Sequence, residues 1–199
     1  MRLGRWFVLS LVVAFAGLSA TAHAAVFNYQ TPMDGPSESP ANASPGTGFA
    51  SLLYDDVAHT MRIQANFTGL TGTTTMAHIH APTVNPFTLT AGVATQLPSF
   101  SGFPLAVTAG SMDTTFDMTL PATWNSSYVT ANGGTTAGAE AAFASHLAQG
   151  RAYFNIHTST FNGGEIRGFF RLIPEPATLA LAAVSALALA VAGRRVRNV

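Results

Sequence analysis

The sequence predicts an all-β domain, an antiparallel β-sandwich or barrel with one short helix, between two apolar terminal segments. Short stretches of alternating apolar and polar residues recur along the chain, and clusters of glycine, proline and asparagine separate them. Only one alanine-rich stretch has the character of a helix. Several short strands with turn signals between them are typical of sandwiches and barrels.

The first expected pair of strands covers residues 48–54 and 61–67, with Asp55-Asp56 beginning the turn between them. In the second strand of this pair every other residue is apolar: Met61, Ile63, Ala65 and Phe67. This period of two indicates a strand with one buried face. A short strand over 76–80 follows and is expected to stop before Pro82.

The second half of the domain begins with residues 83–110, which are rich in glycine and proline and predict a long irregular excursion. Residues 112–118 alternate again and predict a strand. The helix is expected over 137–149, closed by Gly150. The last strands are expected over 151–157 and 165–172, with the turn sequence Phe161-Asn162-Gly163-Gly164 between them.

The N-terminus has the three parts of a secretory signal peptide, predicted over residues 1–24. Arg2 and Arg5 form the basic region, Trp6 to Leu18 is apolar, and Ala22-His23-Ala24 is a small-x-small cleavage site. Signal peptidase is therefore expected to cut after Ala24, so that the domain expected over residues 25–173 begins directly after the cut.

The C-terminus combines Pro174-Glu175-Pro176, an uncharged apolar run over 177–193 and the basic tail that begins at Arg194. As a helix this run spans roughly 25 Å, enough to cross a bilayer, with the arginines on the cytoplasmic side. Residues 174–199 resemble the bacterial PEP-CTERM sorting signal. The resemblance implies that an exosortase-type membrane enzyme removes the helix, so that an inner-membrane-anchored precursor becomes a surface or extracellular protein.

The composition of residues 25–173 excludes several classes of function. This part has four arginines, eight carboxylates and no lysine, a net charge of −4. It is therefore not expected to bind nucleic acid or an anionic membrane surface, both of which need basic patches. The chain has no cysteine, which excludes disulfides and thiolate metal sites.

Histidines give the one cluster with recognisable chemistry. His78 and His80 project from the same face of a strand, and His157 is expected near them if the strands are neighbours. The same face is expected to be an outer one, lined also by Asn155, Glu165 and Arg167. The opposite face is expected to bury the remaining apolar residues of the last two strands: Phe154, Ile156, Ile166, Phe170 and Leu172.

A His-x-His pair with a third distant histidine can hold copper or zinc, because the imidazoles converge at a suitable separation. The outer face of the copper/zinc superoxide dismutase sandwich offers an analogy. The alternative is a structural hydrogen-bond network in which Glu165 and Arg167 serve as partners. The residues leave both interpretations open.

Three segments resemble the chordin-type (CHRD) domain: Ala77-His78-Ile79-His80-Ala81-Pro82, Tyr153-Phe154-Asn155-Ile156-His157-Thr158 and Gly163-Gly164-Glu165-Ile166-Arg167-Gly168. The resemblance covers roughly residues 26–172, and Gly69-Leu70 fits it. A departure is Ala81, where a glycine commonly follows the second histidine. The resemblance implies an all-β sandwich and assigns no catalytic residue.

The expected function is that of an exported, non-enzymatic surface or extracellular-matrix protein of a Gram-negative bacterium. The sorting family is associated with exopolysaccharide, so matrix components are expected partners. No Gly-x-Ser-x-Gly elbow or phosphate-binding glycine loop supports an enzyme of those classes. One alternative is a metal-binding or redox protein that uses the three histidines. The other is a polysaccharide- or ligand-binding module, which exposed aromatics at Phe87, Phe100 and Phe103 would favour.

Overall fold

The computed structural model describes residues 26–174. The signal peptide with Ala24, residues Glu175 and Pro176, and the apolar run 177–193 lie outside the described residues. Among the helices of residues 26–174, none is long and apolar enough to cross a membrane.

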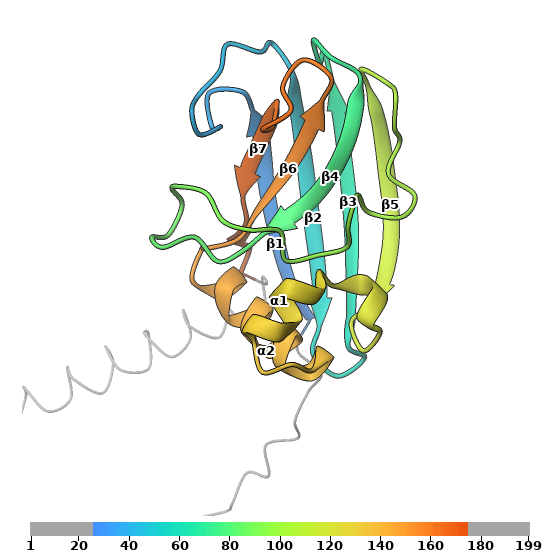
Figure 1. The fold of residues 1–199 in the computed structure, drawn as a ribbon, viewed down its shortest axis with the longest axis vertical. Coiled ribbons are helices and arrows are strands. Elements are labelled where there is room, and N and C mark those ends of the chain that lie inside the picture. Colours follow the sequence, from blue (N-terminus) through green and yellow to red (C-terminus); the bar gives the residue numbers. More distant parts are fainter. Residues whose placement is uncertain (1–25, 175–199) are drawn as a thin grey trace, which may run out of the picture.

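The described residues form mainly an antiparallel β-sheet, which confirms the predicted class. The sheet has eight strands in the order β4-β6-β7-β1-β2-β3-β5, with β8 also paired to β1 (Figure 1). The strands are β1 (Val26–Asp34), β2 (Thr47–Asp55), β3 (Thr60–Thr68), β4 (Thr74–His80), β5 (Gly110–Asp117), β6 (Tyr153–Thr158), β7 (Ile166–Phe169) and β8 (Arg171–Leu172).

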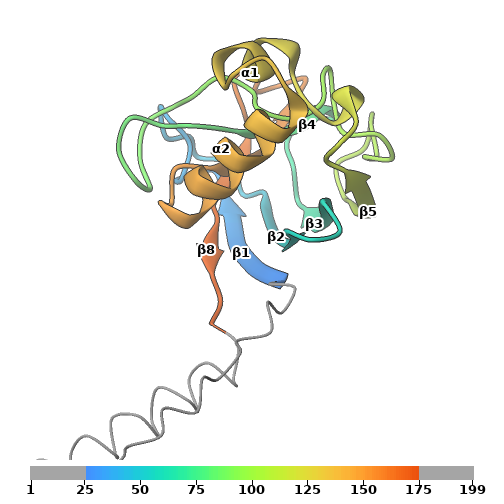
Figure 2. The same ribbon diagram turned by 90° about the horizontal axis from the view of Figure 1, so that it is seen from below.

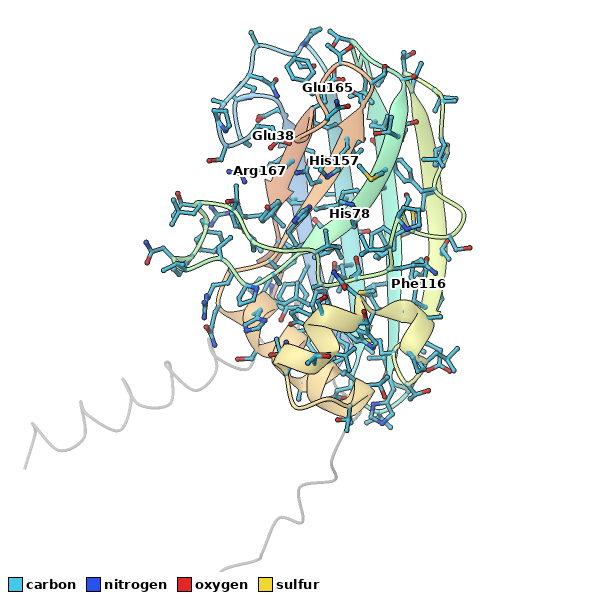
Figure 3. All side chains as sticks on the ribbon, in the orientation of Figure 1. Glu38, His78, Phe116, His157, Glu165 and Arg167 are labelled. Carbon is cyan, nitrogen blue, oxygen red and sulfur yellow. The ribbon has the colours of Figure 1, made fainter. Side chains whose placement is uncertain are left out.

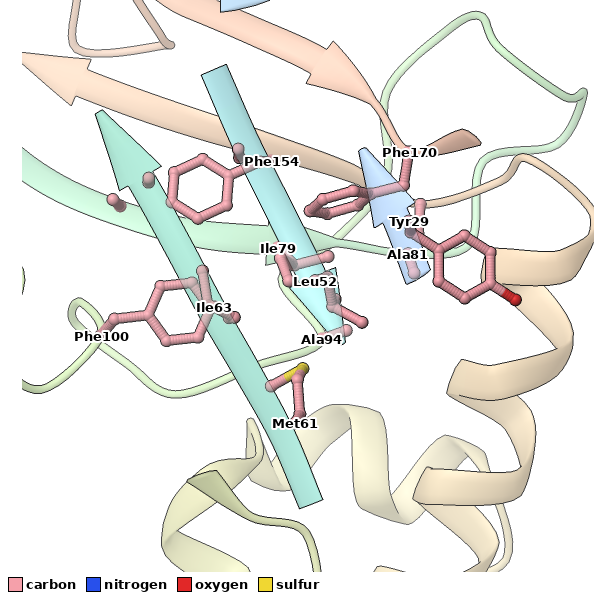
Figure 4. Close-up of a cluster of buried hydrophobic side chains, with 14 of the residues drawn as sticks. Tyr29, Leu52, Met61, Ile63, Ile79, Ala81, Ala94, Phe100, Phe154 and Phe170 are labelled. Atoms are coloured by element: carbon pink, nitrogen blue, oxygen red, sulfur yellow. The ribbon is translucent and has the colours of Figure 1, made fainter. Parts of the chain in front are cut away.

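The sheet curls so that β4 and β6 cross in front of β2 and β3, and the apolar core lies between the two halves (Figures 1 and 4). Ile79 and Phe154 enter the core from one half, and Leu52 and Ile63 enter it from the other; all four are fully buried. This half-barrel arrangement gives each half one face turned toward the core and one turned away from it.

The β2–β3 hairpin appears where the alternation predicts it. All nine residues of each strand pair in register, from Thr47 opposite Thr68 to Asp55 opposite Thr60. The apolar residues of β3 are buried and its Arg62 and Gln64 are exposed. Burial of one face is what holds this register, because a slip by one residue would exchange the two faces.

Two α-helices, rather than the single one expected, cover one end of the curled sheet (Figure 2). The expected helix is α2 (Thr136–Ala148), preceded by α1 (Ser126–Ala131) and a 3-10 turn (Pro121–Thr123). The α1 segment escapes prediction because six residues are too few to establish a helical period. Gly150 follows α2 with φ +67°, the left-handed conformation expected of a residue that ends a helix.

The excursion over 83–110 is irregular, as predicted, but part of it lies along the free edge of β4. The backbone N–H and C=O of Ala77 bond to Ser99 and Phe100, and those of Ile79 bond to Thr95 and Ala94. The segment 94–100 therefore satisfies the edge strand without forming a regular strand of its own.

The last predicted strand is interrupted, which makes one of the burial predictions wrong. β7 ends at Phe169, and β8 leaves it to pair with β1, with Tyr29 opposite Leu172. The break at Phe170 ends the alternation of sides. Phe170 is fully buried as expected, whereas Leu172 is 48% exposed. The other predicted core residues of these strands, Phe154, Ile156 and Ile166, are buried.

Candidate metal centre

Two neighbouring strands bring the three histidines together. His78 and His80 alternate with core residues on β4, and His157 lies on β6, which pairs with β4. The register places Asn155 opposite His78 and Tyr153 opposite His80. The side that faces away from the core thus carries polar residues from three strands, here called the histidine face: His78, His80, Tyr153, Asn155, His157 and Arg167.

The imidazole rings converge closely. Nδ1 of His78 lies 3.2 Å from Nε2 of His80, and the ring of His78 lies 4.8 Å from that of His157, centroid to centroid. One nitrogen of each histidine can be chosen so that all three lie within 4.8 Å of one another. Nitrogens bound to one ion at about 2.0–2.1 Å are at most about 4.2 Å apart. Small rotations of the rings would therefore complete the convergence.

Backbone carbonyls fix the orientation of two rings. Nδ1 of His80 donates to the carbonyl of Ala91 at 2.8 Å, and Nδ1 of His157 donates to that of Asn162 at 2.9 Å. A carbonyl only accepts, so Nδ1 carries the proton and Nε2 of each neutral ring presents a lone pair. Such a bond on the remote nitrogen is typical of metal-binding histidines.

One of these lone pairs is left unused. Among the described residues, Nε2 of His157 is buried and has no hydrogen-bond partner. Nε2 of His80 faces Nδ1 of His78, which donates to it in the metal-free protein. His78 would present a lone pair at Nδ1 by moving that proton to Nε2, a change of tautomer rather than of charge.

The histidine face is turned away from the core, as expected of an outer face, but it is buried. The exposed fractions are 3% for His78, 8% for His80 and 6% for His157. Loops from distant parts of the chain cover it: Leu89 and Ala91 of one loop accept from Arg167 and His80, and Asn162 of another accepts from His157. Sequence alternation separates two faces but does not show which loops fold over them.

Burial keeps the three imidazoles neutral. It lowers the pKa of His78 to about 3, with the neighbouring His80 and His157 adding to the effect. It lowers the pKa of His80 to about 4, against the opposing bond to Ala91, and it also lowers the pKa of His157. Neutral imidazole is the form that binds metal ions.

The metal-free protein is expected to lose stability as the pH falls below about 6.5, the pKa of an unfolded histidine. The unfolded state then takes up protons at His78 and His80, whereas in the folded state these two residues are protonated only near pH 3 and pH 4. Each contributes a loss of about 2 kcal/mol between pH 7 and pH 5. The free energy of unfolding in urea, determined at pH 7 and at pH 5, measures this loss of stability.

Two matched variants test this pH dependence of the unfolding free energy. His78→Gln should make it less steep, and His59→Ala should not. Glu140 raises the pKa of His59 by a hydrogen bond and by its charge, so His59 contributes with the opposite sign. A pH profile of the unfolding free energy that is as steep in His78→Gln as in the wild type would contradict the prediction.

Arg167 lies on the histidine face but pairs with a residue that the sequence did not single out. Its Nε lies 3.8 Å from Oε2 of Glu38 and donates to the carbonyl of Ser37. Its Nη1 donates to the carbonyl of Leu89 at 2.9 Å. Both ion-pair partners are 5% exposed. The guanidinium also lies 4.8 Å from the centre of the Tyr153 ring. Figure 3 shows Glu38, Arg167, His157 and His78 in the same region.

Glu38 is the functional candidate that sequence reasoning missed. Burial raises its pKa to about 7, although Arg167 and the N–H of Ser39 act in the opposite direction. A carboxylate in a loop of serines and prolines carries no periodic signal that would place it against the sheet. Its Oε1 and Oδ1 of Asn155 have no hydrogen-bond partners among the described residues.

Gly164, the glycine directly before Glu165, has a steric role beside these groups. Gly164 has φ +129°, and a Cβ there would lie 2.6 Å from both Asn155 and Glu38. Only glycine combines this conformation with so close an approach. Gly164 thus lets the loop close over the histidine face.

Glu165, predicted to support the histidine face, is bound elsewhere. Its fully buried carboxylate accepts from Ser44 and Thr158 at 2.6 Å and from the hydroxyl of Thr71 at 2.7 Å. Burial raises its pKa, but these bonds outweigh that effect and hold the pKa below its ordinary range. Glu165 is therefore a structural anchor between loops, separate from the three histidines.

These features define an antiparallel β domain in which one polar face is enclosed beneath long loops. The chain belongs to the CHRD domain family, whose profile matches residues 29–170. CHRD domains are typically extracellular or secreted, which is consistent with the predicted export. Comparisons with curated proteins and with solved structures gave no match.

Proposed function

We propose that this protein is an exported, non-enzymatic component of the surface or matrix of a Gram-negative bacterium and binds one transition-metal ion through His78, His80 and His157. The observation that carries the metal site is the buried, unpaired Nε2 of His157, directed from a ring whose other nitrogen is anchored. Copper and zinc are the ions that suit imidazole ligands.

The unpaired nitrogen favours a metal site over a purely structural hydrogen-bond network. A network of buried polar groups is stabilising when every member is paired, and an unpaired buried group costs about 1–3 kcal/mol. Within residues 26–174, Asn155 and His157 both retain unpaired atoms on the histidine face. A bound ion would satisfy the nitrogen of His157 directly.

The burial of the three histidines supports a metal-binding role rather than a catalytic one. With exposed fractions between 3% and 8%, the three imidazoles are shielded from any substrate larger than a small molecule. The aromatic residues of the long excursion give little support to a polysaccharide site, because Phe100 and Phe103 are core residues and only Phe87 is exposed. The non-enzymatic assignment therefore rests on the closed cover of the histidine face.

The proposed route to the surface uses both termini. Signal peptidase would cut after Ala24, and an exosortase-type enzyme would process the chain at Pro174-Glu175-Pro176. Pro174 is exposed two residues after β8, so the folded domain leaves the start of this motif accessible. Exopolysaccharide or other matrix components are the proposed surroundings of the released protein.

The test is metal content. The full chain, purified in mild detergent, stripped with a chelator and reloaded with zinc or copper, is expected to retain one ion per molecule by mass spectrometry. His78→Ala and His157→Ala should weaken binding by at least the 10- to 100-fold that loss of a supporting residue costs a metal site. His59→Ala, a histidine outside the cluster, is the matched control. Equal retention by His78→Ala and the wild type would overturn the proposal.

A further inference from the structure

Met76 lies beside the three histidines, on the same strand as His78 and His80. It precedes His78 by two residues on β4, so its side chain leaves the strand on the histidine face. The strand register places it directly opposite His157 on β6. Directly opposed residues on one face have Cβ atoms about 4.5–5.5 Å apart. Met76 is half-buried, at the rim of the covered region.

We propose that the thioether of Met76 is the fourth ligand of the three-histidine centre and that the ion held there is copper(I). This inference rests on the proposed metal-binding function and deepens it. Methionine is unbranched and adaptable, so its sulfur can turn toward a site next to its own strand position. The lone pair of His157, directly across the strand pair, lacks any other partner among the described residues.

The charge of the site favours a monovalent ion. All four proposed ligands are neutral, and two ionisable side chains beside the histidine face, Arg167 and Glu38, are paired with each other. The carboxylate of Glu165, which could have offset a second positive charge, is bound by Ser44, Thr71 and Thr158. The cost of burying an ion rises steeply with its charge unless anionic ligands compensate it. Copper(I) therefore costs less here than zinc(II) or copper(II).

The ligand chemistry points the same way. Thioether sulfur is a soft ligand that selects copper(I), whereas zinc sites are built from imidazole, thiolate and carboxylate. Three imidazoles alone would accept either metal. Met76 is then the residue that determines specificity, and its effect should differ between the two ions.

The experiment compares two metals in two methionine variants of the full chain. Copper(I) affinity is measured anaerobically with a reductant by competition with a coloured copper(I) chelator, and zinc affinity is measured with a zinc chelator. Wild type should hold copper(I) more tightly than zinc. Met76→Leu should lose about tenfold or more in copper(I) affinity, the lower end of the effect of a lost supporting residue, and change little for zinc. Met112→Leu, in the core of β5, should match wild type for both ions.

The outcomes separate this inference from the proposed function. Unchanged copper(I) affinity in Met76→Leu would overturn the role of Met76. Tighter binding of zinc than copper(I) by the wild type would overturn the copper(I) assignment while leaving the three-histidine site in place. Binding of neither ion would overturn both. X-ray absorption at the copper edge should show a sulfur neighbour in wild type that is missing in Met76→Leu.

Discussion

Replacement of Glu165 by alanine is expected to lower the free energy of unfolding by about 4 kcal/mol, because each buried donor that loses its acceptor costs about 1–3 kcal/mol. The carboxylate accepts from the hydroxyls of Ser44, Thr71 and Thr158 and from the backbone N–H groups of Thr71 and Gly72, at 2.5–3.2 Å. Removing it leaves the donors of Ser44, Gly72 and Thr158 buried without an acceptor, and the segments that they belong to lose their common attachment.

Urea unfolding monitored by circular dichroism measures this loss. Glu165→Gln keeps the shape and one acceptor oxygen, so it should lie between alanine and wild type. Asp113→Ala is the matched control, because Asp113 bonds to Arg62 and Gln64 on the exposed face of the sheet, where solvent screens the pair. A loss at Glu165 no larger than that at Asp113 would contradict the assigned role.

Replacement of Arg167 by leucine is the second change with a large expected effect, a loss of about 3–5 kcal/mol. The guanidinium is the buried partner of Glu38 and the donor to the carbonyls of Ser37 and Leu89. Without it, Glu38 stays buried without a counter-charge, and two covering loops lose their bond to β7.

The pH dependence of this loss follows from Glu38. Its folded pKa of about 7 lies above the unfolded value of about 4.3, so its contribution to stability decreases as the pH rises between them. The charge of Arg167 lowers the pKa of Glu38 in the folded protein. Without Arg167 this pKa is higher, so the stability contributed by Glu38 continues to decrease up to a higher pH. Arg167→Leu should therefore be more destabilised at pH 8 than at pH 5.

A double-mutant cycle measures the pairing directly. Glu38→Gln combined with Arg167→Leu removes the unpaired charge, so the double variant should be more stable at pH 8 than Arg167→Leu alone. Unfolding in urea at pH 5 and pH 8 gives the four free energies that the cycle needs. Strict additivity of the two single changes would show that the two side chains are not coupled.

The parts of the fold that could be predicted are those in which local pattern and burial agree. β3 alternates because one of its faces is in the core, and α2 begins and ends at recognisable capping residues, Thr135 and Gly150. β1 was missed although it lies inside the sheet, between β7 and β2. Its buried positions include Thr31, and Pro32 interrupts the strand pattern, so nothing local distinguishes it from a loop.

For the candidate site, the sequence could predict that the three histidines lie close together, but not that loops cover them. The spacing of His78 and His80 fixes their common face, and pairing of β4 with β6 adds His157. The cover depends on contacts between residues far apart in the chain, such as the bond of Arg167 to Leu89. Long-range contacts of irregular loops leave no periodic pattern in the sequence, which is why neither Glu38 nor the burial of the outer face could be predicted.

The closed edge of β4 has a consequence for how the molecules behave when crowded. A free edge strand invites pairing with a strand of another chain and is a common starting point of aggregation. The segment 94–100 already uses the edge-facing backbone groups of Ala77 and Ile79, and the opposite edge, β5, presents exposed Asp113 and Asp117. Both edges therefore oppose the addition of a neighbour, so the domain is expected to stay free of edge-to-edge pairing at high concentration.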